Sequence, residues 1–193
     1  MSLEQPEQSY DYKPSSFGAP LAFTLKDEGM QWNIGMRAGT LRYDQIRRIR
    51  LSFRPVTMQT YRFMAEIWSE DMPRIRIAST TWRGIVEQTR QDESYSSFIV
   101  ELHKRIAKSG HAAEFITGVP VFNYGLGLVV FVGVALGLAW LTVRAISLAE
   151  WGGVLLIGGF FALFLWQFGA FFSRNRPGTY QPDDIPKVVL PRA

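Results

Sequence analysis

Two stretches decide the architecture of this chain: FNYGLGLVVFVGVALGLAWLTV (residues 122–143) and WGGVLLIGGFFALFLWQFGAFF (residues 151–172). Neither contains a charged residue. A helix rises about 1.5 Å per residue, so about 20 residues cross a hydrocarbon core about 30 Å thick. A chain of 193 residues has no room to bury two helices that are apolar on every side. The sequence therefore predicts a hairpin of two membrane-spanning helices.

Basic residues flank this hairpin unevenly. The connection between the two spans, residues 144–150, contains only Arg144. Seven basic residues lie before the first span or after the second: Lys104, Arg105, Lys108, Arg174, Arg176, Lys187 and Arg192. Because Lys and Arg are retained on the cytoplasmic side of a membrane, both termini are expected in the cytoplasm.

Small residues in the spans are candidates for helix packing. Gly133 and Gly137 form a GxxxG motif in the first span, and Gly158 and Gly159 lie in the second. Such residues let helix backbones approach closely, either between the two spans or against another membrane protein. Gln167 is the one strongly polar side chain deep in a span, and its amide is expected to form a hydrogen bond between helices.

Residues 21–109 show the two-residue period of β-strands. Apolar residues alternate with polar ones at 23–25 and 32–34, at 46–53, at 61–68 and at 74–77, with turn residues between these stretches. A meander of antiparallel strands is the simplest arrangement. A helix is expected to follow, with Asp92 as its N-cap, Gly110 as its stop and an apolar stripe that includes Phe98, Ile99 and Leu102.

This order of elements resembles the bacterial pleckstrin-homology-like (PH-like) domains, some of which are fused to membrane spans. The resemblance covers about residues 21–118 and includes the segments LRYDQIRRIRLSF (41–53) and SYSSFIVELHKRIAKSG (94–110). It implies an α+β fold, in which a bent antiparallel sheet is closed by the C-terminal helix, and a place in the bacterial inner membrane. Relatives that bind inositol phosphates have basic residues in the first hairpin, whereas residues 26–29 here are acidic on balance.

Four parts of the chain are therefore expected. They are a flexible N-terminal segment (1–20), the cytoplasmic PH-like domain (21–118), the transmembrane hairpin (119–173) and a Pro-rich cytoplasmic tail (174–193). Prolines favour extended chain in the tail. Two alternatives stay open for it: residues 188–190 add to a sheet edge of the domain, or the tail is disordered.

An arginine row is the candidate binding face. The strand period places six arginines on the polar face of neighbouring strands: Arg48, Arg50, Arg54, Arg62, Arg74 and Arg76. Such a row can bind anionic lipid headgroups or acidic protein groups. The alternative is an ordinary solvated face balanced by Glu66, Glu70 and Asp71. Nucleic acid is not expected as a partner, because the net charge is only +4.

No residue pattern points to chemistry. The chain has no cysteine, and neither His103 nor His111 has a partner at metal-ligand spacing, so both are expected to be surface histidines. No stretch matches a phosphate-binding loop or a nucleophile motif, so neither a cofactor nor an enzyme activity is expected. The leading expectation is a non-catalytic regulatory or accessory module of an inner-membrane complex, which binds a membrane protein or a second copy of itself. The alternatives are a protein that binds an anionic lipid surface and a channel or transporter subunit, in which Gln167 would line the path.

Overall fold

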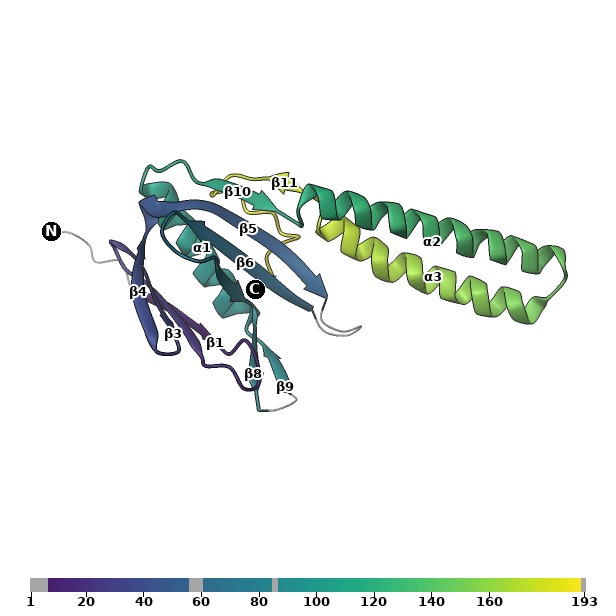
Figure 1. Ribbon diagram of the computed structural model, residues 1–193, viewed down its shortest axis with the longest axis horizontal. Coiled ribbons are helices and arrows are strands. Elements are labelled where there is room, and N and C mark those ends of the chain that lie inside the picture. The colour runs from purple at the N-terminus through teal and green to yellow at the C-terminus, as the bar shows by residue number, and fades with distance from the viewer. Residues whose placement is uncertain (1–6, 56–60, 85–86, 192–193) are drawn as a thin grey trace. The chain divides into compact units, whose positions relative to one another are not determined.

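The computed structural model of this α+β protein describes residues 7–55, 61–84 and 87–191. The chain forms two compact units, Met1–Gly118 with Gly178–Ala193, and Val119–Pro177. The first unit contains the sheets and one helix, and the second is a helical hairpin (Figure 1).

The first sheet has four antiparallel strands in chain order. They are β1 (Gln8–Tyr12), β2 (Leu21–Leu25), β3 (Gly29–Ile34) and β4 (Arg37–Arg42). The hairpin of β2 and β3 is the one that the sequence predicted. Gly39 of β4 lies opposite Trp32 of β3, and a Cβ atom at this position would lie 2.7 Å from the Trp32 ring. Glycine therefore leaves room for the indole to lie across the sheet.

Strand β1 lies within residues 1–20, where flexibility was expected. Residues 1–6 are outside the described part of the chain, but residues 8–12 pair along their whole length with β2. Tyr10 and Tyr12 are buried, with Phe23 and Leu21 as their cross-strand partners. The expectation was wrong for these residues, because a composition average over 20 residues hides two alternating tyrosines.

The second sheet contains the predicted meander. A short 3-10 helix, η1 (Tyr43–Gln45), leads into β5 (Ile46–Pro55), which pairs with β6 (Tyr61–Ser69), and β6 pairs with β7 (Ile75–Ala78), all antiparallel. Leu51, Ala65 and Ile77 are neighbours across the three strands and are buried in the core. A separate hairpin follows, formed by β8 (Thr80–Arg83) and β9 (Glu87–Arg90).

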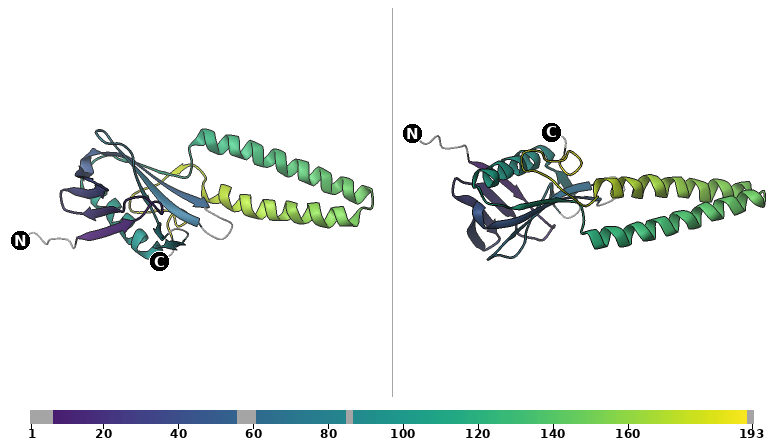
Figure 2. Two further views of the ribbon diagram at one scale, coloured as in Figure 1. Left: turned by 60° about the horizontal axis from the view of Figure 1, so that its bottom comes forward. Right: turned by 90° about the horizontal axis from the view of Figure 1, so that it is seen from above.

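Helix α1 (Asp92–Lys108) covers the apolar face of β5 and β6 (Figures 1 and 2). Its predicted apolar stripe is confirmed, since Phe98, Ile99 and Leu102 are fully buried. The helix starts one residue earlier than expected: Gln91 is the N-cap and Asp92 already belongs to the first turn. Gly110 ends the helix at φ 72°, as predicted.

The helix is not the last element of this unit. Strand β10 (Glu114–Thr117) follows it and pairs in parallel with β5, and β11 (Gly178–Thr179) pairs antiparallel with β10. The second sheet therefore has the order β11-β10-β5-β6-β7, and the described strands form no closed barrel. The structure shows an α+β domain with antiparallel and mixed sheets, in which the expected helix packs against the core but two short strands follow it.

The tail after the hairpin packs on the first unit. Val189 is buried in the core, and Tyr180, Ile185 and Leu190 pack against it. Of the two alternatives for the tail, the edge strand does not form at residues 188–190, which lie in a turn and a bend, and the strand that the tail adds is β11. Residues 192–193 lie outside the described residues.

His103 is buried, which corrects the expectation of a surface histidine. Its Nδ1–H donates to the Ile99 carbonyl (2.7 Å), and its Nε2 accepts a hydrogen bond from the Tyr180 hydroxyl (2.7 Å). Arg105 on the same helix is also buried and pairs with Glu101 (2.9 Å). This side of α1 was expected to face water, but Tyr180 of the tail covers His103, and no local pattern reveals a contact across 77 residues.

The second unit consists of α2 (Val121–Ser147) and α3 (Trp151–Arg174), joined by a short turn in which Ala149 has φ 55°. The helices run antiparallel and pack through Phe131 and Phe164, whose ring centroids lie 5.2 Å apart. Both are long and apolar enough to span a membrane, which suggests membrane association. In each, the most apolar stretch of 18 residues contains no side chain buried inside the protein.

The buried histidine makes stability depend on pH. Burial lowers the pKa of His103 to about 4, from 6.5 in an exposed histidine. The unfolded chain therefore binds more protons than the folded chain between about pH 6.5 and 4. The free energy of unfolding should fall as the pH falls through this range, by up to about 1.4 kcal/mol per pH unit.

Urea unfolding of the full chain in detergent measures this effect, with the non-titrating variant His103→Gln as the control for other groups. The stability difference between the two proteins should shrink as the pH falls from 7 to 5. A difference that stays constant would contradict the neutral, buried histidine.

Candidate functional site

The six arginines of the predicted face come from β5, β6, β7 and the turn before β7. Arg50 of β5 lies directly opposite Glu66 of β6, and Glu66 lies opposite Arg76 of β7. Arg54 lies opposite Arg62 in the same way. Directly opposed residues point to the same face of a sheet, so the alternation predicted this face correctly.

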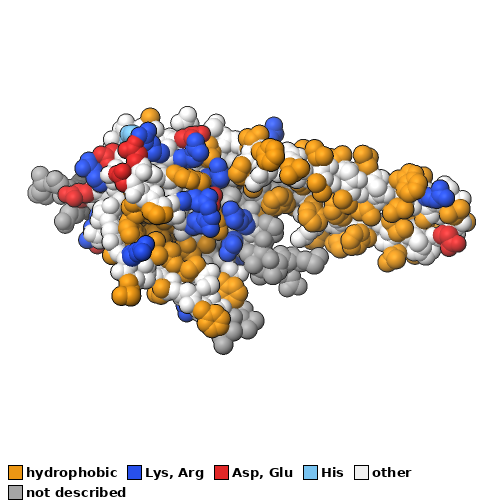
Figure 3. Space-filling model, in the orientation of Figure 1, with side chains coloured by type: hydrophobic (Ala, Val, Ile, Leu, Met, Phe, Trp, Pro, Cys, Tyr) orange, Lys and Arg blue, Asp and Glu red, His pale blue; other side chains and the backbone are white. Residues whose placement is uncertain are grey.

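Glu66 is the centre of this face. Its side chain is only 2% exposed, and it forms ion pairs with four guanidinium groups: Arg74 at 3.3 Å, Arg76 at 3.4 Å, Arg54 at 3.7 Å and Arg50 at 3.8 Å. We call these four arginines and Glu66 the arginine cluster. Figure 3 shows blue side chains gathered on this side of the sheet. A carboxylate removed from water is costly unless opposite charge surrounds it, which the cluster provides.

The ion pairs in the cluster are long. Charge-assisted hydrogen bonds of arginine to carboxylate measure about 2.7–2.9 Å, and all four distances exceed this range. The buried Oε1 atom of Glu66 has no hydrogen-bond partner among the described residues. Each guanidinium has five N–H donors. Glu66 therefore neutralises part of the charge without forming a close, forked hydrogen bond with any of the four arginines.

Trp68 fixes two of the arginines. The guanidinium groups of Arg50 and Arg74 lie over its ring, 5.0 and 5.5 Å from the ring centroid. A cation over an indole is attracted by the negative face of the ring. The strand alternation predicted only that Trp68 lies in a strand. Its contact with the two guanidinium groups depends on Arg50 of β5 and Arg74 before β7, which lie on either side of it.

Arg62 adds positive charge without an acidic partner. It forms no ion pair with a described residue, and its Nε atom is buried without a hydrogen bond to one. Burial lowers the pKa of Arg62, and the charges of Arg54 and Arg76 lower it further, while Tyr12 acts in the opposite direction. Arg62 and the arginine cluster together carry five guanidinium groups against the single carboxylate of Glu66, an excess of four positive charges.

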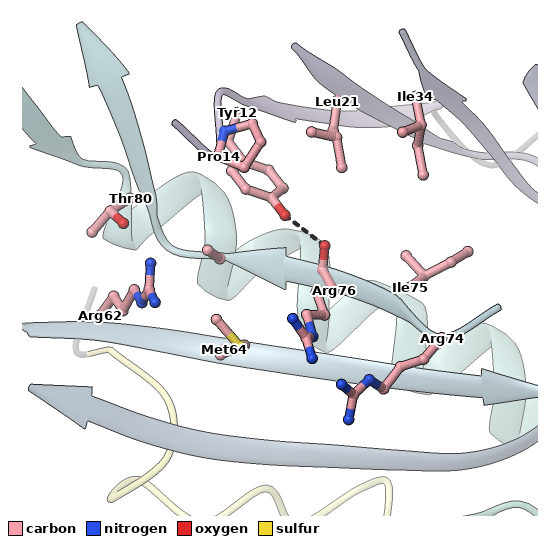
Figure 4. Close-up of a pocket in the computed structure, with 11 residues that line it drawn as sticks. Tyr12, Pro14, Leu21, Ile34, Arg62, Met64, Arg74, Ile75, Arg76 and Thr80 are labelled. Atoms are coloured by element: carbon pink, nitrogen blue, oxygen red, sulfur yellow. Dashed lines mark hydrogen bonds between the residues drawn. The ribbon is translucent and has the colours of Figure 1, made fainter. Parts of the chain in front are cut away.

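Beside Arg62 and Arg76 a pocket of about 550 Å³ opens between the two larger sheets (Figure 4). One wall comes from β6 and β7 and includes Arg62, Arg74 and Arg76, and the other comes from β1, β2 and β3. Tyr12 of β1 bridges the gap, because its hydroxyl donates to the Arg76 carbonyl (2.6 Å). Burial raises the pKa of Tyr12 to about 12, so the hydroxyl keeps its proton at neutral pH.

Arg48 lies apart from the arginine cluster. Its Nε–H donates to Glu114 of β10 at 2.6 Å, and both side chains are about half exposed. Of the acidic residues expected to balance the face, Glu66 lies inside the cluster, and Glu70 pairs with Arg47 near the end of β6. The structure thus brings together five of the six predicted arginines.

The predicted packing residues of the hairpin behave differently from one another. A Cβ atom at Gly158 would contact Thr142 of α2 at 3.7 Å, so this glycine lies between the helices. Cβ atoms at Gly133, Gly137 and Gly159 would meet open space. The GxxxG motif therefore does not pack against α3. Gln167 is partly buried, and its amide makes no hydrogen bond with the residues that the structure describes.

Neither metal ligands among the described residues nor similarity to known proteins points to a chemistry. The described residues contain no group of three or more His, Cys, Asp or Glu side chains that could hold a metal ion. Comparison of the chain with family models, curated proteins and solved structures finds no match. The arginine cluster and its pocket are the features of the described residues on which a function can be argued.

The role of Glu66 can be tested by its neutral isostere. Glu66→Gln leaves four converging guanidinium groups without their anion, and the free energy of unfolding should fall by about 1–3 kcal/mol. This loss should be smaller than the cost of breaking a fully buried ion pair, about 3–5 kcal/mol, because the arginines are partly in water.

Urea unfolding of the full chain in detergent provides the measurement. The control is Glu70→Gln, which removes an exposed pair with Arg47 and should change stability by no more than about 0.5 kcal/mol. Equal effects of the two substitutions would show that Glu66 is an ordinary surface carboxylate.

Proposed function

We propose that this chain is a non-catalytic binding module of a membrane complex, in which the sheet domain presents the arginine cluster to an acidic group of a membrane-protein partner. The observation that carries the proposal is an excess of four positive charges on one face: four arginines share the single carboxylate of Glu66, and Arg62 beside them has no acidic partner among the described residues. Forked guanidinium groups recognise carboxylates through paired hydrogen bonds, and arginine is enriched at protein interfaces.

The glycines of the helical hairpin are evidence for a partner within the membrane. Gly133 and Gly137 lie one helical turn apart on α2, and neither is covered by α3. Small residues at this spacing allow a further helix to approach closely. In the proposal, Gly133 and Gly137 of α2 contact a helix of the partner within the membrane. The arginine cluster contacts an acidic group of the same complex outside the membrane.

The location in the proposal is the bacterial inner membrane, with two spans and both termini in the cytoplasm. It is supported by the excess of basic residues outside the hairpin and by the two apolar helices. The resemblance to PH-like domains stays a prediction. The meander and the packed helix agree with it, and strands β10 and β11 after the helix are additions to it.

Cysteine labelling tests this topology, since the native chain has no cysteine. Ser147→Cys lies at the end of α2 and should react with a membrane-impermeant thiol reagent on intact cells. Lys108→Cys lies at the end of α1 and should react only after the membrane is opened. The reverse pattern would place the sheet domain outside the cytoplasm.

The arginine cluster should hold the complex together. Arg54 and Arg76 are the most exposed of its four arginines, at 43% and 52%. When these two are replaced, Glu66 still forms ion pairs with Arg50 and Arg74. The double variant Arg54→Gln/Arg76→Gln should fold, but the complex should dissociate at a lower salt concentration than the wild type.

Native mass spectrometry of the complex, extracted in mild detergent and exposed to increasing salt, gives the readout. Arg48→Gln is the matched control, because this arginine lies on the same face but is already paired with Glu114. Recovery of the wild-type chain only as a monomer under several extraction conditions would refute the proposal.

An anionic lipid surface is the second candidate, favoured by the exposure of Arg54 and Arg76. Cations near an anionic leaflet contribute about 1 kcal/mol each. A fluorophore on Arg48→Cys in nanodiscs distinguishes the two candidates. If anionic lipid shifts the emission and high salt reverses the shift, the face binds the lipid surface. Equal emission in neutral and anionic lipid would favour the protein partner.

A further inference from the structure

The pocket beside the arginine cluster has two chemically different walls. Three guanidinium groups, from Arg62, Arg74 and Arg76, line one side. The other side and the floor are apolar, with Leu21, Ile34, Met64, Ile75 and Ala78 among the lining residues. In Figure 4 Leu21 and Ile34 lie across the pocket from Arg74 and Arg76. The volume of about 550 Å³ falls in the range of small-molecule sites.

The charged wall is not neutralised by the protein. Arg74 and Arg76 share Glu66 with two further arginines, at distances of 3.3 and 3.4 Å that are too long for close, forked hydrogen bonds. Arg62 has no acidic partner among the described residues, and its Nε atom is withdrawn from water without a hydrogen bond. Both conditions favour an oxyanion, which would supply the missing charge and the missing acceptors.

The apolar wall is only partly covered. Ile34 is 37% exposed, and it lies opposite Leu21, which is only partly buried and packs against the core. Tyr12 and Pro14 enclose this end of the pocket. An inorganic anion would leave these side chains in contact with water, whereas a ligand with a short hydrocarbon part would cover them.

We infer that this pocket binds a single-chain amphiphile, whose phosphate or carboxylate head lies at Arg62 and Arg76 and whose hydrocarbon part lies against Leu21 and Ile34. The inference goes beyond the proposed function, because the ligand is a small molecule inside the pocket and not the surface of a partner. Phosphate and carboxylate share the oxyanion that forked arginines recognise.

Isothermal titration of the full chain in neutral-lipid nanodiscs tests the inference, with empty nanodiscs subtracted. The probes are hexyl phosphate, butyl phosphate, inorganic phosphate and hexanoate. Because a buried methylene raises affinity about fourfold, hexyl phosphate should bind about 16-fold more tightly than butyl phosphate. Inorganic phosphate should bind more weakly than either ester, and the comparison with hexanoate identifies which oxyanion the arginines prefer.

Two variants separate the two walls. Arg62→Gln should lower the affinity for hexyl phosphate about tenfold to hundredfold, since it removes a charged donor. Arg48→Gln changes the same residue type on the same sheet face, outside the pocket, and should leave the affinity unchanged. Ile34→Asn should reduce the difference between hexyl and butyl phosphate while binding of inorganic phosphate stays the same.

Several results would overturn the inference. These are the absence of saturable binding, equal affinities for hexyl and inorganic phosphate, or equal losses in Arg62→Gln and Arg48→Gln. Equal affinities would mean that only an oxyanion is bound, without an apolar subsite. The outcome is distinct from that of the proposed function, because a complex that survives extraction shows a partner whether or not hexyl phosphate binds.

Discussion

A carboxylate that is withdrawn from water needs positive charge beside it, and in this protein Glu66 meets that need through arginines from β5, β7 and the turn before β7. The register of β5, β6 and β7 places Arg50 and Arg76 directly opposite it. A shift of β6 by one residue would move Glu66 into the apolar core and Ala65 to the charged face. The same contact therefore fixes the strand register and concentrates positive charge on one face.

The gap between the two larger sheets determines where this charge becomes accessible. No strand pairs with the outer edge of β7 among the described residues, and two tyrosine hydroxyls satisfy its carbonyl groups instead. Tyr10 donates to the Ala78 carbonyl and Tyr12 to the Arg76 carbonyl, each at 2.6 Å. Side-chain bridges leave the sheets further apart than a backbone ladder would, and the pocket lies along this opening. The fold and the candidate site thus have a common origin at the edge of β7.

Sequence periodicity was sufficient for the parts of the structure whose pattern is local. The unbroken apolar runs predicted α2 and α3, and the two-residue period predicted the meander and the face on which the arginines lie. It did not show that Glu66 is buried, because alternation does not distinguish a solvated row from one covered by long arginine side chains. His103, the parallel pairing of β10 and the pocket wall at Tyr12 depend on residues distant in sequence, which no local pattern encodes.

Glu66 and the surrounding arginines should behave as one coupled unit, and a double-mutant cycle between Glu66 and Arg74, the closest pair at 3.3 Å, measures this coupling. The cycle compares the free energies of unfolding of the wild type, Glu66→Gln, Arg74→Gln and the double variant in detergent. Residues of one ion-pair network usually show coupling of about 0.5–3 kcal/mol. If the unit is coupled, Arg74→Gln should destabilise the wild type by at least about 1 kcal/mol more than it destabilises Glu66→Gln. Additive effects, within about 0.3 kcal/mol, would contradict it.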